Sequence, residues 1–144
     1  SHLWRTWDKP MLIDVVRAIH EMGKLVHIHF HGRTTDVLDD LREIGADCVC
    51  PFERPIGGDI EGFDGLVEAM TRLDGKVTFN GNVHTVDTLI RGTETQVRME
   101  VSQIKEAAHA TGSAHRLIIG SGDQVGKETP QENIIAMIEE GMRV

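Results

Sequence analysis

Three histidines alternate with apolar residues in one short stretch of the chain, His27, His29 and His31, and the stretch ends at Gly32. The alternation predicts a β-strand, because successive side chains of a strand point to opposite faces of a sheet. The three imidazoles therefore share one face, where an ordinary half-buried strand carries Thr, Lys or Glu. Imidazole serves in proton transfer, anion binding and metal ligation. The alternative is that these rings are hydrogen-bonded side chains without a chemical role.

Length and charge narrow the classes of ligand. The chain of 144 residues is 40% hydrophobic, which is typical of one domain with a real core. Its net charge is −8 with the histidines neutral, and no stripe of Lys or Arg is present, which argues against a nucleic-acid or anionic-membrane partner. We therefore expect a small-molecule substrate.

Targeting signals are absent from the sequence. No apolar run approaches about 18 residues and nothing resembles a signal peptide, so we expect no membrane association and a cytoplasmic location. The first residue is Ser1 rather than Met, and we expect the chain to be a piece of a longer protein.

Cys48 and Cys50 lie two residues apart on a predicted strand. This spacing does not suit a relaxed disulfide, so we expect two reduced, buried thiols. Metal binding by the two cysteines is the alternative.

Hydrophobic periodicity and helix-end residues predict a helix followed by four strand–helix units. Strands that alternate with helices of this length indicate parallel strands joined by right-handed crossovers, hence an α/β sheet. The predicted helices cover 8–23, 35–45, 64–73, 93–111 and 130–142, and the predicted strands cover 25–31, 46–52, 76–79 and 116–119. Asp8 caps the first helix, which has Pro10 in its first turn, and Thr34 or Thr35 caps the second. Thr93–Gln96 and Thr129–Glu132 are predicted capping boxes.

Polar residues collect at the carboxyl ends of these predicted strands. Open α/β sheets and α/β barrels both bind their ligands at that end. The carboxylates of Glu53 and Asp123 could equally be solvated or cap loops, and His84 could cap the helix that follows it. The candidate residues are His29, His31, Glu53, Asn82, His84, Ser121 and Asp123.

Five ordered motifs then indicate a family. His29-Phe30-His31-Gly32 resembles a His-x-Cys-Gly motif, and Gly57-Gly58-Asp59 resembles a Gly-Asp loop. The chain resembles, over nearly its whole length, the carboxyl-terminal half of the uroporphyrinogen decarboxylase superfamily, which includes the decarboxylase and cobalamin-dependent methyltransferases. The other matching segments are Phe79-Asn80-Gly81-Asn82-Val83, Arg91-Gly92-Thr93-Glu94 and Thr129-Pro130-Gln131-Glu132-Asn133.

The resemblance implies a (β/α)8 TIM barrel, of which four parallel βα units form the carboxyl-terminal half. Residues 1–144 would then be one partial barrel domain of the uroporphyrinogen decarboxylase type. A half barrel leaves two strand edges and its inward face open, so we expect a homo-oligomer or association with the missing half barrel. We expect the full-length protein to be an enzyme and this piece alone to be inactive.

Two departures from the family motifs change which residues could bind a metal. The methyltransferase branch holds zinc with the His and Cys of His-x-Cys and a further Cys at the last strand, but His31 and Ser121 stand at the two Cys positions here. Imidazole and carboxylate also suit zinc. The resemblance thus implies zinc or another divalent metal on His29 and His31, and methyl transfer that involves a corrinoid on a partner protein. Glu53, Asp123 and His84 are the predicted catalytic residues, Glu53 or Asp123 being a third ligand or base, and Asn82, His27 and Ser121 are the predicted substrate contacts.

Three alternatives stay open. Tetrapyrrole decarboxylation is the first, although the Gly-His-Gly expected at the last strand reads Gly120-Ser121-Gly122. A metal-dependent hydrolase is the second, because His-x-His on a strand with a late Asp123 suits that chemistry, but such barrels place His-x-His on their first strand. The third is a non-catalytic half barrel that serves in binding or assembly.

Overall fold

The computed structural model describes residues 2–143 and confirms an α/β fold with four parallel βα units. The strands lie in the order β1-β2-β3-β4, so each is paired with its neighbour in the sequence. The strands are β1 (His27–Phe30), β2 (Cys48–Pro51), β3 (Thr78–Val83) and β4 (Leu117–Ser121); the helices are α1 (Lys9–Glu21), α2 (Leu38–Ile44), α3 (Gly62–Leu73), α4 (Glu94–Ala110) and α5 (Gln131–Met142); the short elements are η1 (Trp4–Asp8), η2 (Thr35–Val37), η3 (Thr85–Ile90) and η4 (Ala114–Arg116).

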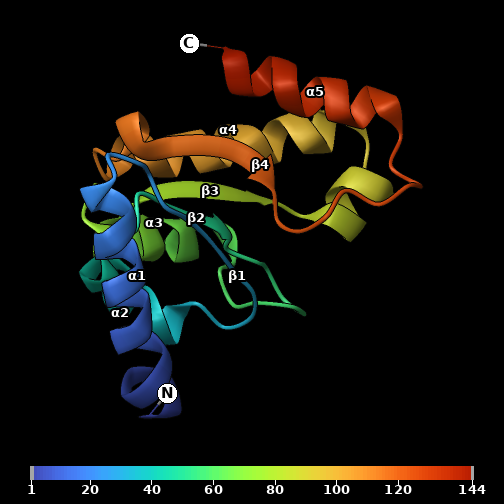
Figure 1. Ribbon diagram of the computed structural model, residues 1–144. Helices are drawn as coiled ribbons and strands as arrows, with labels where there is room; N and C mark the ends of the chain where they lie inside the picture. The colour runs from blue at the N-terminus through green and yellow to red at the C-terminus, as the bar shows by residue number, and fades with distance from the viewer. Residues whose placement is uncertain (1, 144) are drawn as a thin grey trace.

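The hydrophobic core lies between the sheet and the helices α2, α3 and α4 (Figure 1). Val49 of β2 and Phe79 of β3 are at most 1% exposed, and the ring of Phe52 stacks on that of Phe79 with 4.3 Å between centroids. α5 packs mainly on α4. Within residues 2–143, no helix combines the length and apolarity that crossing a membrane requires.

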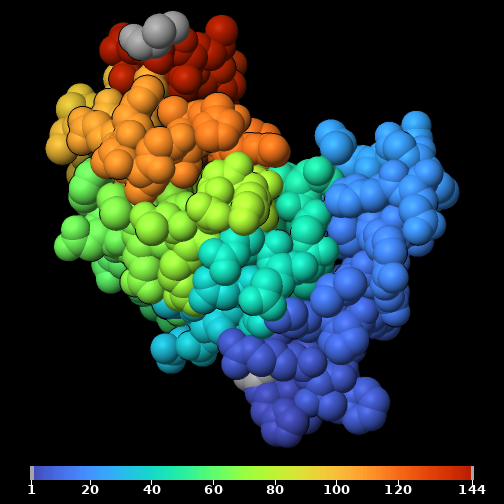
Figure 2. Space-filling view, turned by 90° about the vertical axis from the view of Figure 1, so that its left-hand side faces the viewer, coloured from blue at the N-terminus to red at the C-terminus, as the bar shows by residue number. Residues whose placement is uncertain are grey.

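The opposite face of the sheet is open, and the histidines lie on it. Ile28 and Phe30 pack toward the core, whereas His27 and His29 are exposed, which confirms the predicted alternation along β1. The surface is hollowed between the N-terminal segment, in blue, and the orange segment near residue 115 (Figure 2). We call this open side of the sheet the inner face.

The first helix starts earlier than predicted. Asp8 was expected as its cap, but Asp8 has helical dihedral angles and makes no side-chain cap bond, and the helix already includes the π-helical turn η1. Pro10 explains the wide turn, because it has no N–H to offer the carbonyl of Thr6 and its ring would clash there in a regular helix.

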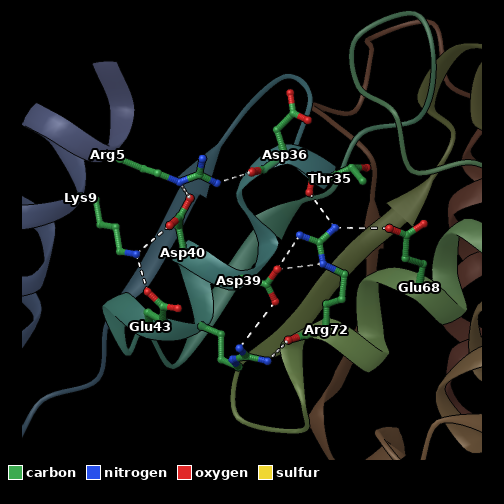
Figure 3. A network of polar contacts seen from close by, with 10 residues as sticks. Arg5, Lys9, Thr35, Asp36, Asp39, Asp40, Glu43, Glu68 and Arg72 are labelled. Atoms are coloured by element: carbon green, nitrogen blue, oxygen red, sulfur yellow. Dashed lines mark hydrogen bonds and ion pairs between the residues drawn. The ribbon is translucent and has the colours of Figure 1, made fainter. Parts of the chain in front are cut away.

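Charged side chains attach this first helix to α2, and α2 to α3 (Figure 3). The buried carboxylate of Asp40 accepts from Arg5 Nε at 2.9 Å and from Lys9 Nζ at 2.7 Å. Arg72 on α3 donates to Asp39 at 2.8 Å and to the carbonyl of Thr35 at 2.8 Å. The Arg72 guanidinium lowers the pKa of the Asp39 carboxyl, through its hydrogen bond first and its charge second.

Two strands are longer than predicted at their carboxyl ends. The segment 80–84 was expected to leave the strand, but β3 continues to Val83, and β4 continues to Ser121 instead of ending at Ile119. Pairing explains the difference, because Asn82 lies opposite Gly120 and Val83 opposite Ser121 in the parallel ladder. Asn and Gly have low strand propensity, so the local sequence does not predict that the strands extend over these residues.

Of the predicted threonine caps at the starts of helices, one is confirmed and two are wrong. The capping box at Thr93 and Gln96 is confirmed, with both reciprocal hydrogen bonds present. The predicted box at Thr129 is wrong: α5 begins at Gln131 with Pro130 at the N-cap, so Thr129 lies one residue too early to cap it. Thr34 makes no cap bond either, because the 3-10 turn η2 precedes α2.

Candidate active site

Three side chains from different strand ends meet at the carboxyl edge of the sheet. His31 follows β1, Glu53 follows β2 and Asp123 follows β4, and one ligand atom of each lies within 4.8 Å of the others. Donor atoms on opposite sides of a divalent ion are about 4.2 Å apart, so small side-chain movements bring these three onto one ion. Imidazole and carboxylate are donors that suit zinc and manganese. The described part of the chain contains no second cluster of this kind.

Glu53 is held firmly for this role. Its Oε2 accepts from the N–H of Gly32 at 2.8 Å and lies 3.1 Å from His31 Nδ1, and its side chain is only 12% exposed. Gly58 folds back over it, and a Cβ at residue 58 would lie 2.2 Å from the Glu53 carbonyl oxygen. The Gly57-Gly58 pair therefore lets the loop after β2 close against its own first residue.

His29 does not join that cluster but contacts it through His31. The Nε2 atoms of His29 and His31 are 2.6 Å apart, and His29 Nδ1 lies 3.2 Å from Cys50 Sγ. The register of β1 and β2, which places His29 opposite Cys50, brings the thiol and the imidazole together. A series of polar contacts thus runs from Cys50 through His29 and His31 to Glu53, the last of them an ion-pair contact.

Both cysteines are free thiols, as predicted, but they are half-buried rather than buried, and they lie on the inner face next to the histidines. Burial, and after it the charge of Cys50, raises the pKa of Cys48 to about 11. Burial also raises the pKa of Cys50. Both sulfurs are therefore protonated at neutral pH in the metal-free protein.

Two predicted site residues have structural partners. Asn82 is 1% exposed, and its Nδ2 donates to the carbonyls of Phe52 at 3.0 Å and Ile60 at 3.4 Å, so it fixes both ends of the loop that carries Glu53. His84 caps η3, because its Nδ1 accepts from the N–H of Asp87 at 3.0 Å. Its Nε2 donates to the carbonyl of Pro55 at 3.1 Å, so both ring nitrogens are engaged. Catalytic or substrate roles for these residues stay predictions.

A pocket of about 430 Å³ adjoins Glu53 and Asp123, between the loops that follow β2 and β3. Glu100 of α4 holds both loops with one oxygen, which accepts from Arg54 Nη1 at 2.5 Å and from the N–H of His84 at 2.9 Å. Sequence reasoning missed Glu100, because 46 residues separate it from Arg54 and no local pattern links them.

The remaining predicted residues lie at the rim of this arrangement. His27 is exposed on the inner face opposite Cys48, one layer below His29, and Ser121 ends β4 beside Val83. Cys50 was missed as a contact of the site, although one signal could have found it: Cys-x-Cys on β2 has the same spacing as His-x-His on β1.

Comparison with known proteins agrees with the fold and the motifs. A methyltransferase from Methanosarcina mazei has a similar structure, with a TM-score of 0.75 and 19% sequence identity, over 96% of this chain and 36% of that one. This chain therefore spans about a third of that protein's length. No curated protein matches the sequence. The sequence model of the uroporphyrinogen decarboxylase (URO-D) family matches residues 1–143, and the chain belongs to this family.

Proposed function

We propose that this chain supplies the metal-holding part of a methyltransferase barrel, with His31, Glu53 and Asp123 as the ligands of a divalent metal. The observation that carries the proposal is the approach of these three donors to within 4.8 Å from three strand ends. The similarity to a methyltransferase supports the type of reaction. Four strands make half of a (β/α)8 barrel, so catalysis by the whole protein needs the remaining strands as well.

The bound metal would act as a Lewis acid, which lowers the pKa of an acceptor group or polarises a methoxy donor. The chain's own residues have defined tasks. His31 offers Nδ1, and Glu53 is kept in place by the Gly32 N–H. Asp123 approaches from β4 and supplies a second carboxylate, which binds the ion or accepts the substrate proton. The small-molecule substrate would enter the pocket beside Glu53 and Asp123.

His29 has a supporting task in this proposal. If His31 held the metal through Nδ1, its Nε2 would carry the ring proton and would donate a hydrogen bond to His29 Nε2, which lies 2.6 Å away. Such contacts to the second nitrogen orient the ring of a ligating histidine and raise its basicity. The methyl group would pass from a corrinoid on a partner protein to the activated acceptor, or from the polarised methoxy donor to the corrinoid; the family resemblance implies the corrinoid.

Metal analysis tests the proposal. After equilibration with zinc and gel filtration, the wild-type chain should retain one ion per chain under conditions where Glu53→Gln and Asp123→Asn lose it. Asp87→Asn is the matched control, since Asp87 lies at the same pocket but outside the cluster. Equal zinc content in all four proteins would refute the metal site.

Tetrapyrrole decarboxylation is the second candidate, and the family match supports it. It predicts a different dependence on the same residues. A decarboxylase should keep its activity in the whole protein after metal is removed by a chelator, whereas the proposed methyltransferase should lose it.

A further inference from the structure

We propose that His84 is a pH-sensitive positioning residue, whose neutral ring ties together two loops that line the pocket of about 430 Å³ and whose protonation lets one wall of that pocket move. We call its two ring hydrogen bonds the latch. The role of this pocket as the entry site of the substrate rests on the proposed function, whereas the latch stands without it.

The ring of His84 joins the loop after β2 to the first turn of η3. Its Nδ1 accepts from the N–H of Asp87 at 3.0 Å, and its Nε2 donates to the carbonyl of Pro55 at 3.1 Å. Pro55 and Asp87 both line the pocket. The side chain of His84 is 19% exposed, whereas the other seven histidines are exposed, so this ring is held between its partners rather than free in solvent.

The two partners require one protonation state of the ring. A backbone N–H only donates, so Nδ1 must carry a lone pair toward Asp87, and a carbonyl only accepts, so Nε2 must carry the proton toward Pro55. Both ring nitrogens of an imidazolium are donors. A second proton on His84 therefore breaks the bond from Asp87 and leaves the bond to Pro55 in place.

His84 occupies the position of a helix cap, where histidine is an unusual choice. Ser, Thr, Asn and Asp are the common caps, and none of them changes charge between pH 5 and 8. Imidazole is the side chain that does so. The start of η3 therefore responds to pH in a range where an ordinary cap is unaffected.

The far end of η3 is held without His84. Leu89 is 0% exposed, and the Nδ2 of Asn133 on α5 donates to the carbonyls of Leu89 at 3.0 Å and Gly92 at 2.9 Å. Loss of the cap therefore leaves this end in place. The segment that becomes free to move is Thr85–Asp87, which is a wall of the pocket.

Charged groups of both signs surround this latch. The carboxylate of Asp87 lies 3.9 Å from His84 Nε2 and offers the protonated ring a new partner in place of the Asp87 N–H. The groups that face the ring, pair with its neighbours or line its pocket are Asp87 and Arg91 of the η3 segment, Glu100 of α4, Glu53 and Arg54 of the loop after β2, and Asp123 of the loop after β4.

Nuclear magnetic resonance on the metal-free chain tests the latch. At pH 8 the His84 ring should be the Nε2–H tautomer. Titration to pH 5 should reduce the hydrogen-exchange protection of the Asp87 amide by roughly tenfold, the effect of one lost hydrogen bond, in step with the protonation of His84. An Nδ1–H tautomer at pH 8 would overturn the proposal, as would constant Asp87 protection while His84 gains its proton; neither result depends on a variant.

Two variants assign the pH response to this ring. The oxygen of Asn caps a helix without titrating in this range, so His84→Asn should keep the Asp87 amide protected from pH 8 to pH 5. His109→Asn, the same change at an exposed histidine of α4, should keep the wild-type response. A response that persists in His84→Asn would refute the latch.

A distance measurement tests the opening of the pocket. Spin labels at Ile56→Cys and Val86→Cys, in a chain with Cys48 and Cys50 changed to Ser, report the separation of the two loops at the pocket. Their mean distance should increase by more than about 2 Å from pH 8 to pH 5, and adding His84→Asn should abolish the increase. A constant distance despite protonation of His84 would overturn the opening. Neither experiment uses a metal, so a chain that shows the latch but retains no zinc would refute the proposed function alone.

Discussion

At the scale of single residues, the site depends on how the loop after β2 places Glu53. Gly58 is decisive there, because a Cβ would meet the Glu53 carbonyl oxygen at 2.2 Å and the backbone must move to avoid it. Asn82 holds the two ends of the same loop from below. The position of one carboxylate therefore depends on a missing side chain and on one buried amide.

The first prediction follows for Gly58→Ala. We expect zinc affinity to fall by roughly tenfold, because Glu53 is displaced from His31 while the donors themselves remain. Isothermal titration with zinc measures the effect. Gly62→Ala is the control at the end of the same loop, since no atom lies within 4 Å of a Cβ built there, although its positive φ adds some strain. Equal affinities of wild type and Gly58→Ala would contradict the role given to Gly58.

Asp47 gives a prediction of pH dependence. Its Oδ2 accepts from the N–H of Val26 at 2.7 Å and contacts His20 Nε2 at 2.8 Å, and these bonds, the backbone bond first, lower its pKa. A lowered carboxyl pKa stabilises the fold above the unfolded value of about 3.9, and this stabilisation disappears as the pH falls through the folded value.

Asp47→Asn should accordingly reduce the free energy of unfolding by about 1 kcal/mol at pH 7, because a charged acceptor is replaced by a neutral one. The difference from wild type should shrink below about pH 4. Urea denaturation across this pH range measures it, with Glu106→Gln on the exposed side of α4 as the control. A difference that grows on acidification would contradict the assignment.

At the scale of elements, two helix starts have the same capping-box pattern in the sequence but differ in the structure. Thr93 caps α4 by accepting from the N–H of Gln96. The Oγ1 of Thr129 is buried before α5 and has no hydrogen-bond partner among residues 2–143. The effects of the same Thr→Val change at the two positions therefore distinguish a hydroxyl that caps a helix from a buried hydroxyl without a hydrogen-bond partner.

We expect Thr93→Val to cost about 1 kcal/mol of stability, the usual value of a cap. Thr129→Val should be neutral or stabilising, since removing an unpaired buried hydroxyl removes its desolvation penalty. Thermal or urea unfolding of the two variants provides the comparison. Equal losses in both would show that Thr129 also caps its helix.

The helices could be predicted because periodicity and glycine stops are local signals; Gly45, for example, follows α2 in the left-handed conformation. The strand order could not be predicted from such signals, and only the resemblance to a (β/α)8 barrel implied it. The strand ends could not, because Asn82 and Ser121 are extended through pairing with a neighbouring strand rather than through their own preference. The site was predictable in part: the strand ends indicated His31, Glu53 and Asp123. The contact of Cys50 with His29 depends on the β1–β2 register, which no single segment specifies.

At the scale of the whole molecule, the sheet has two free edges. Within residues 2–143, β1 pairs only with β2, and β4 pairs only with β3. Ile118 lies on β4 with 48% of its surface exposed. Unpaired strand edges beside exposed apolar side chains favour association with further strands.

Light scattering on the isolated chain should therefore give a mass above that of one chain, increasing with concentration. Ile118→Lys should shift the population toward the monomer, because a charge next to an edge opposes pairing. Exposed Met99 on α4, changed to Lys, is the control that should leave the mass unchanged. A wild-type monomer at high concentration would contradict the prediction.

The packing of the first helix affects how unfolding is observed. The chain has two tryptophans and no tyrosine. Trp4 meets the ring of Phe30 edge to face at 5.1 Å, whereas Trp7 is 71% exposed. Intrinsic fluorescence thus reports the docking of this helix on β1 and is blind to the other strands. If the helix detaches first, emission changes will precede the loss of circular dichroism, and an apparent intermediate will be this helix released from an intact sheet.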